Sequence, residues 1–217
     1  MTSFNKPNRI RNRGSPILAN RDSGEDTKSR LIRAATRVFA EHGSQKATIS
    51  EIARLANISE SAIYEYFQGK EDLLLAIPDV WVSQAITELE EQLFGIKGTK
   101  NLLRKFLWWY LRYIEKEPLI ARVVFLFLKG NRGFVDTPVY TNVRIFYSRL
   151  TAIFQEGIDS SELRPDLSPY VARSIFLGAI EHMVVRWLMK DMSYSLFDNL
   201  ENTFDTLVHG MEPTDRR

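Results

Sequence analysis

Residues 48–74 of the chain have the sequence TISEIARLANISESAIYEYFQGKEDLL. Thr48 with a glutamate three residues later forms a capping box, which is typical of a helix N-terminus. Apolar side chains follow at helical spacing until Asn57, and Ser59 can cap a second helix, predicted for residues 60–67. Two short helices joined by a tight turn predict a helix-turn-helix, whose second helix can enter the major groove of DNA.

The segment before this pair predicts a further helix that supports it. Between residues 27 and 42, apolar side chains recur with the spacing of one buried helix face, and Gly43 can end that helix. Four residues of the following pair are expected to form the small core that fixes its angle: Ile52, Ala53, Ile58 and Ile63.

The rest of the chain also predicts helices rather than strands. Helical patterns cover residues 70–94, 99–117, 118–129, 140–158, 168–190 and 195–208, with a loop at 130–137. The prediction is an all-α fold of about nine helices, with a three-helix helix-turn-helix head and a larger helical body. The expected boundaries are 1–24 for a disordered basic arm, 25–72 for the head and 73–217 for the body.

Charge is distributed unevenly along the chain. Residues 1–70 contain twelve lysines and arginines and seven acidic residues, a net charge of +5, while the remainder carries −3. A basic head suggests a polyanionic partner, and double-stranded DNA fits the helix-turn-helix. The arm at 1–24 is either a solvated tail or a segment that follows the DNA backbone or enters a minor groove.

Composition and motifs exclude several other classes of protein. The chain has no cysteine, so it offers neither a disulfide framework nor a thiolate metal site. The first residues lack the apolar core of a secretory signal, and the longest apolar run, near 120–128, is half of what a membrane span needs. We therefore expect a cytoplasmic protein without a membrane partner. Its three histidines lack metal-ligand spacing and no phosphate-binding or nucleophile motif is present, so we expect no metal, no cofactor and no enzyme.

The head resembles the DNA-binding region of the TetR family of transcriptional regulators. The resemblance rests on F-A-E-x-G at 39–43, T-I-x-x-I-A at 48–53 and S-x-x-x-I-Y-x-Y-F-x-x-K-E-x-L at 59–73, all in register. It covers residues 27–74 without a gap. At Asn57 the family more commonly has glycine, but asparagine tolerates the left-handed conformation, so the turn is expected to form.

The resemblance implies DNA-contacting roles for particular residues of the head. Thr48 would hold a phosphate at a helix N-terminus, Tyr64 and Tyr66 would contact phosphates or a thymine methyl, and Lys70 would pair with a phosphate. The residues implied to face the bases are Ser59, Ser61, Ala62 and Glu65. Each role has a plainer alternative: Thr48 as a helix cap only, Tyr64 as a core residue, and Lys70 as a solvated charge.

The body contains an aromatic cluster that has two interpretations. It is either ordinary core, or the wall of an apolar pocket for a small hydrophobic effector whose anionic group is held by arginines. The candidate pocket residues are Phe106, Trp109, Tyr110, Tyr113, Phe125, Arg122 and Arg144. Because some TetR relatives respond to fatty acyl-CoA, the resemblance makes a fatty acyl-CoA one expected effector.

Residues 168–190 combine apolar and small side chains, which suits close packing between helices. TetR-like proteins dimerise through their last two long helices, so the resemblance implies a homodimer with a four-helix interface. The candidate interface residues are Ala172, Ile175, Phe176, Ala179, His182 and Met183. Two heads about one helical turn apart would recognise a palindromic operator.

Together these features predict a ligand-responsive, DNA-binding transcriptional regulator. The resemblance favours a repressor that a small hydrophobic effector releases from its operator. Effector binding is expected to shift the helix at 70–94, which Pro78 is expected to bend. The alternative is a helical protein–protein interaction module whose head has lost DNA binding.

Overall fold

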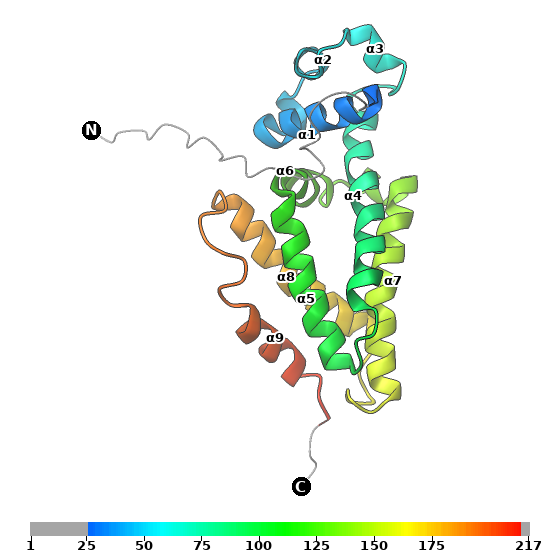
Figure 1. Ribbon diagram of the computed structural model, residues 1–217, viewed down its shortest axis with the longest axis vertical. Helices are drawn as coiled ribbons and strands as arrows, with labels where there is room; N and C mark the ends of the chain where they lie inside the picture. The colour runs from blue at the N-terminus through cyan, green and yellow to red at the C-terminus, as the bar shows by residue number, and fades with distance from the viewer. Residues whose placement is uncertain (1–25, 214–217) are drawn as a thin grey trace, which may run out of the picture.

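The computed structural model describes residues 26–213, and the arm predicted at 1–24 lies outside them. The described residues form nine α-helices, a π-helix and a 3-10 helix without any strand, which confirms the all-α prediction. The elements are α1 (Thr27–Lys46), α2 (Ile49–Ala56), α3 (Glu60–Tyr64), α4 (Lys70–Leu93), α5 (Thr99–Lys116), α6 (Pro118–Arg122), the π-helix η1 (Val123–Leu128), the 3-10 helix η2 (Arg132–Asp136), α7 (Pro138–Asp159), α8 (Pro169–Met189) and α9 (Leu200–His209). Figure 1 shows α1–α3 as a small head at one end and α4–α9 as the body.

The head has the small apolar core that its sequence predicts. Ile52, Ala53 and Ile63 are buried, and Ile58 packs against them partly buried. Asn57 ends α2 in the left-handed conformation, with φ 56° and ψ 50°. The turn between α2 and α3 therefore forms with asparagine in the position where the family more often has glycine.

The second helix of the pair, α3, is shorter than predicted. It ends at Tyr64, where the N–H of Tyr66 donates at 3.0 Å to the carbonyl of Ile63, three residues earlier and not four as in an α-helix. Phe67 then turns inward and is buried in the head. The following tight turn leads into α4, the long helix that continues from the head into the body (Figure 1).

Two segments of the body differ from the prediction for local reasons. The helix expected at 118–129 is divided into α6 and the π-helix η1, which the N–H of Lys129 closes by donating to the carbonyl of Val124 at 3.0 Å. The last helix begins at Leu200 rather than at 195. Ser195 Oγ accepts the N–H of Phe197 at 3.1 Å, and such a local bond competes with helix formation.

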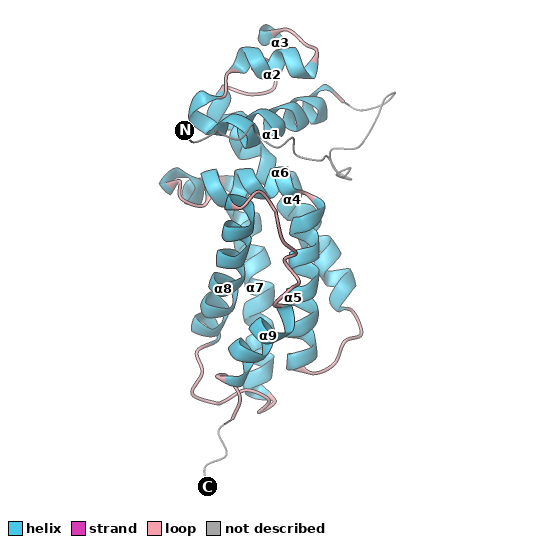
Figure 2. Cartoon of the chain, turned by 90° about the vertical axis from the view of Figure 1, so that its left-hand side faces the viewer, coloured by secondary structure: helices cyan, strands magenta, loops and turns pink. Residues whose placement is uncertain are grey.

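The body is built around an aromatic core that joins three helices. The ring of Phe106 on α5 lies 5.8 Å from that of Phe146 on α7 and 6.3 Å from that of Phe176 on α8, centroid to centroid. Figure 2 shows these helices side by side, with α6 between the head and the bundle.

Head and body meet where α1 contacts α4, α6 and η1. Gly43 has a φ of 77°, which interrupts α1 at the residue where the sequence predicts a helix end. A Cβ atom added to Gly43 would lie 3.6 Å from the ring of Phe127, so the π-helix packs directly against the interruption in α1.

Candidate DNA-binding face and effector cavity

Thr48 and Ser59 cap the N-termini of α2 and α3 with exposed side chains. Thr48 Oγ1 accepts the N–H of Glu51 at 3.2 Å, and Ser59 Oγ accepts the N–H of Ala62 at 3.2 Å. The hydroxyls of Ser59 and Ser61 lie 2.9 Å apart. Apart from the partly buried Ala62, these predicted contact residues are exposed, and the structure brings Ser59 and Ser61 into direct contact.

Two aromatic side chains of the head lie outside its core. Tyr64 is 58 % exposed and Tyr66 is 44 % exposed, whereas the neighbouring Phe67 is buried. The alternative of Tyr64 as a core residue is therefore wrong. An exposed tyrosine can place its ring against an apolar group and its hydroxyl against a phosphate oxygen. Glu65 is also exposed beside them.

Lys70 has a structural contact that the sequence did not indicate. Its ammonium donates to the carbonyl oxygens of Ala47 at 3.1 Å and Gln45 at 3.4 Å, so it ties the start of α4 to the α1–α2 connection. An ammonium has three donors, which leaves one for a phosphate. Lys70 therefore positions the head and keeps one donor that neither carbonyl uses.

The body contains an apolar cavity of about 190 Å³ between α4, α5, η1, η2 and α7. Its lining residues are Pro78, Trp81, Val82, Ala85, Tyr110, Tyr113, Val124, Phe125, Lys129, Phe134, Val135, Tyr140, Val143, Phe146 and Tyr147. Tyr113 stacks on Trp81 with ring centroids 5.4 Å apart and donates its hydroxyl to the Trp81 carbonyl at 2.7 Å. These contacts fix one wall of the cavity on α4.

Only some of the predicted pocket residues line this cavity. Tyr110, Tyr113 and Phe125 do, whereas Phe106 and Trp109 are buried in the core and do not line it. Arg122 and Arg144 were expected to hold an anionic group, but neither is among the lining residues. The guanidinium of Arg122 instead donates to Asp191 at 3.0 Å and to the carbonyl of Leu188 at 3.3 Å, and Arg144 is exposed.

The lining residues that the sequence analysis missed come mainly from α4 and α7. On α7, Tyr140, Val143 and Tyr147 follow one another at spacings of three and four, which places them on one helix face. That spacing could have identified these three residues from the sequence as one face of a helix. Lys129, at the end of η1, had none, because nothing local distinguishes it from a surface lysine.

One of the described residues that line the cavity, Lys129, is charged. Lys129 forms an ion pair with Glu181 of α8, and its ammonium lies 4.8 Å from the centroid of the Phe125 ring. Burial raises the pKa of Tyr110 well above its usual range, and the nearby Glu181 carboxylate raises it further. Burial and then Glu181 raise the pKa of Tyr147 in the same direction.

These tyrosines predict a loss of stability at alkaline pH. Tyr110, Tyr113 and Tyr147 all have raised pKa values, chiefly through burial. Above about pH 10 the unfolded chain releases these protons and the folded chain keeps them, so the free energy of unfolding falls as pH rises. Below that pH these groups leave the free energy of unfolding unchanged. Spectrophotometric titration should show three of the eight tyrosines ionising only as the protein unfolds. Ionisation of all eight in the folded state would contradict this expectation.

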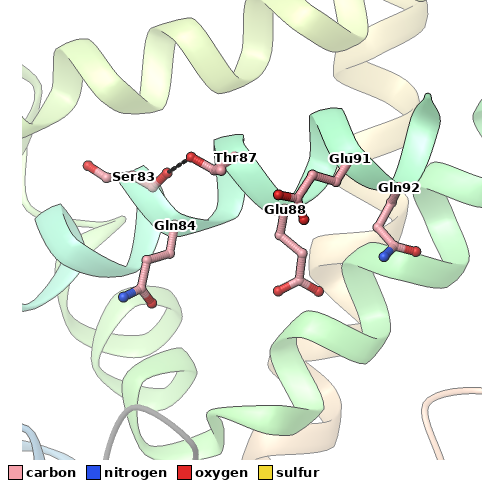
Figure 3. Close-up of a pocket in the computed structure, with 6 residues that line it drawn as sticks. All are labelled: Ser83, Gln84, Thr87, Glu88, Glu91 and Gln92. Carbon is pink, nitrogen blue, oxygen red and sulfur yellow. Dashed lines mark hydrogen bonds between the residues drawn. The ribbon is translucent and has the colours of Figure 1, made fainter.

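A second hollow lies on the outside of α4 and has a different character. Figure 3 shows its lining side chains, which all come from one helix: Ser83, Gln84, Thr87, Glu88, Glu91 and Gln92. Glu88 already accepts from Trp109 Nε1 at 3.0 Å and from Lys116 at 3.0 Å. A polar surface of this kind does not suit a hydrophobic effector.

The predicted dimer residues divide between two faces of α8. Ala172 and Phe176 are fully buried in the subunit's own core, so they offer no surface to a partner. Ile175 and His182 are exposed, and Ala179 and Met183 are partly exposed. Of the six predicted interface residues, only the four that are not buried are therefore accessible to a partner.

Among residues 26–213, no helix is long and apolar enough to span a membrane. Nor do the same residues bring together three or more histidine and acidic side chains that could hold a metal ion.

Comparison with known proteins covers both head and body. Residues 31–77 match the family described as "Bacterial regulatory proteins, tetR family", and residues 80–210 match "YsiA-like protein, C-terminal region". The chain is 34% identical over 204 residues to the HTH-type transcriptional regulator TtgR of Pseudomonas putida, covering 88% of this chain and 93% of TtgR.

Another relative is the fatty acid metabolism regulator protein of Bacillus subtilis (strain 168), 28% identical over 181 residues that cover 83% of this chain and 93% of the relative. The crystal structure of FadR from Bacillus subtilis in complex with stearoyl-CoA has a similar fold, with a TM-score of 0.77 at 28% identity over 84% of this chain and 98% of that one. The chain thus belongs to the TetR family of bacterial DNA-binding transcriptional regulators.

Proposed function

We propose that this regulator represses transcription as a homodimer bound to a palindromic operator, and that a long-chain fatty acyl-CoA releases it. The observation that carries the proposal is the apolar cavity walled by α4, the helix that also begins at the head. The Bacillus subtilis relative that crystallised with stearoyl-CoA supports the choice of effector. The protein would act by binding and not by catalysis.

We assign the DNA contacts to the outer face of the head. Thr48, Tyr64, Tyr66 and Lys70 would bind phosphates, and Ser59, Ser61, Ala62 and Glu65 would face the bases. Exposure of the two tyrosines and the spare donor of Lys70 support this assignment. The body at 73–217 would bind the effector and dimerise, the head at 25–72 would bind DNA, and the arm at 1–24 would add basic charge.

The cavity is too small for a long acyl chain unless some of its lining residues move. About 190 Å³ is less than the ~300–1,000 Å³ of ordinary small-molecule sites. A long acyl chain must therefore displace part of the lining, which includes Pro78, Trp81 and Ala85 of α4. If DNA fits the empty form better than the filled form, binding of the effector weakens DNA binding by that difference in free energy.

The π-helix offers a second connection from the cavity to the head. Phe125 of η1 lines the cavity, while Phe127 lies against Gly43 at the interruption in α1. π-helices are rare and often occur at functional sites. A displacement of η1 by the effector would reach α1 through this contact, while α4 would carry it to Lys70.

The dimer is assigned to the outward face of α8. Val171, Ile175 and His182 are exposed and spaced by four and seven residues, which gives one continuous stripe. Gly178 lies within the stripe, and a Cβ added there would meet nothing within 4 Å. A stripe of this kind suits close approach of the same helix from a second subunit.

Selection of operators from random duplex DNA at a stated salt concentration tests the first half of the proposal. We expect an enriched palindrome with two half-sites. The enriched duplex then serves as a probe with stearoyl-CoA, and with CoA alone as the control. Release by stearoyl-CoA only is the expected result. Absence of any enriched sequence would favour an interaction module, and an enriched palindrome that no acyl-CoA releases would overturn the effector assignment.

A further inference from the structure

The ion pair between Lys129 and Glu181 lies at the edge of the cavity and is not accounted for by its contribution to stability. Of the described residues that line the cavity, Lys129 alone carries a charge. The side chains of Lys129 and Glu181 are 28% and 21% exposed, so the pair lies at a partly open edge. Desolvation offsets much of the attraction in such pairs, and their net contribution to stability is small. A role in binding therefore accounts better for a cation in this apolar wall.

The surroundings of the pair allow Lys129 to change partner. Its ammonium lies 4.8 Å from the Phe125 ring and 6.0 Å from the Tyr147 ring, and both rings line the cavity. Glu181 also lies close enough to Tyr110 to raise the pKa of its hydroxyl, so a neutral donor stays near the carboxylate. The lysine can therefore turn toward a ligand while the carboxylate keeps the Tyr110 hydroxyl nearby.

We propose that Lys129 binds the carbonyl oxygen of the acyl thioester and releases Glu181 when the effector enters, so that this pair selects thioesters over free fatty acids. The inference rests on the proposed effector class. A thioester carbonyl is a neutral acceptor, so Lys129 can turn to it without a second negative charge being brought close to the Glu181 carboxylate. A free fatty acid would place a second carboxylate next to Glu181 with a single cation between them, and like charges at close range repel.

The same exchange acts on the π-helix. The N–H of Lys129 closes η1 by donating to the carbonyl of Val124, so a lysine that turns toward the ligand pulls on the end of η1. Phe127, two residues earlier, packs against Gly43 in the head. Recognition of the thioester and displacement of the head would therefore start at one residue.

The test compares three proteins on the selected operator: wild type, Glu181→Gln, and the double variant Lys129→Met with Glu181→Gln, which leaves no unpaired charge. Stearoyl-CoA, stearate and CoA alone are titrated against each complex, and release is followed by fluorescence anisotropy. Wild type should respond to stearoyl-CoA at a concentration about tenfold or more below that of stearate. Glu181→Gln should bring the two concentrations closer together, because stearate should then release the operator at a concentration about tenfold lower than it needs with wild type. The double variant should need about ten- to a hundredfold more stearoyl-CoA, the range expected for losing a hydrogen bond to a charged donor.

A matched control is the ion pair between Lys100 and Glu212, which joins the start of α5 to the chain after α9 and lies outside the cavity. Lys100→Met with Glu212→Gln makes the same chemical change and should respond like wild type. Loss of response in this control, or an unchanged response of the Lys129 double variant, would overturn the inference while the acyl-CoA response of wild type still stands. No response of wild type to stearoyl-CoA would overturn the proposed effector and the inference together. Operator binding without effector shows that each head is folded.

Discussion

Phe106→Ala should lower the free energy of unfolding by about 3–5 kcal/mol, the range for truncating a fully buried phenylalanine. The ring has no exposed surface and lies among the aromatic rings of three helices, including Phe146 on α7 and Phe176 on α8. Alanine would leave a cavity that these large, mutually packed side chains cannot close. Removing the ring therefore loses the favourable free energy of transferring it from water to the core, and it also loses the ring's contacts with α7 and α8.

Chemical denaturation at one fixed protein concentration measures this loss, since the stability of a dimer depends on concentration. Phe94→Ala is the matched control, because Phe94 is 90% exposed and the same substitution there should change the free energy of unfolding by less than about 0.5 kcal/mol. Equal effects of the two substitutions would show that the aromatic core does not hold α5 to α7 and α8.

The head could be predicted from sequence because its determinants are local. The caps at Thr48 and Ser59, the left-handed turn at Asn57 and the buried Ile63 lie within sixteen residues, and the structure has each of them in its expected role. Capping and turn formation depend on neighbours in the chain, so a short motif contains the information. The contact of Lys70 with Gln45 and Ala47 was missed because it spans more than twenty residues.

The cavity could be predicted only in part because its walls come from segments far apart in the chain. Periodicity identifies aromatic residues that are buried, but it does not separate Tyr110, which lines the cavity, from Phe106, which fills the core. The Lys129–Glu181 pair joins residues more than fifty positions apart, and no local pattern links them. Helix α8 is a related case. Ala172 and Phe176 face the core, Ile175 faces outward, and a helix apolar on both sides gives no sequence signal for which face meets a partner.

Lys70→Ala should weaken operator binding most at low salt and make that binding less dependent on salt. Each phosphate contact contributes about 0.9 to the slope of log K against log salt, and a dimer has two copies of Lys70, so the slope should fall in magnitude by about two. Between 50 and 200 mM salt, wild-type affinity should then decrease about tenfold more than that of the variant. Lys97→Ala is the control, since Lys97 is exposed in the α4–α5 loop, at the end of the body away from the head (Figure 1).

The salt dependence separates the two roles that the structure gives Lys70. If its ammonium contacts a phosphate, the slope changes and the loss of affinity is largest at low salt. If it serves only to hold the carbonyls of Ala47 and Gln45, the variant loses head stability and binds more weakly by the same factor at every salt concentration, with the slope unchanged. A thermal unfolding curve of the variant beside the salt series measures the structural part. An unchanged slope would remove Lys70 from the DNA contacts, and it would leave Thr48, Tyr64 and Tyr66 as the phosphate-binding residues of the head.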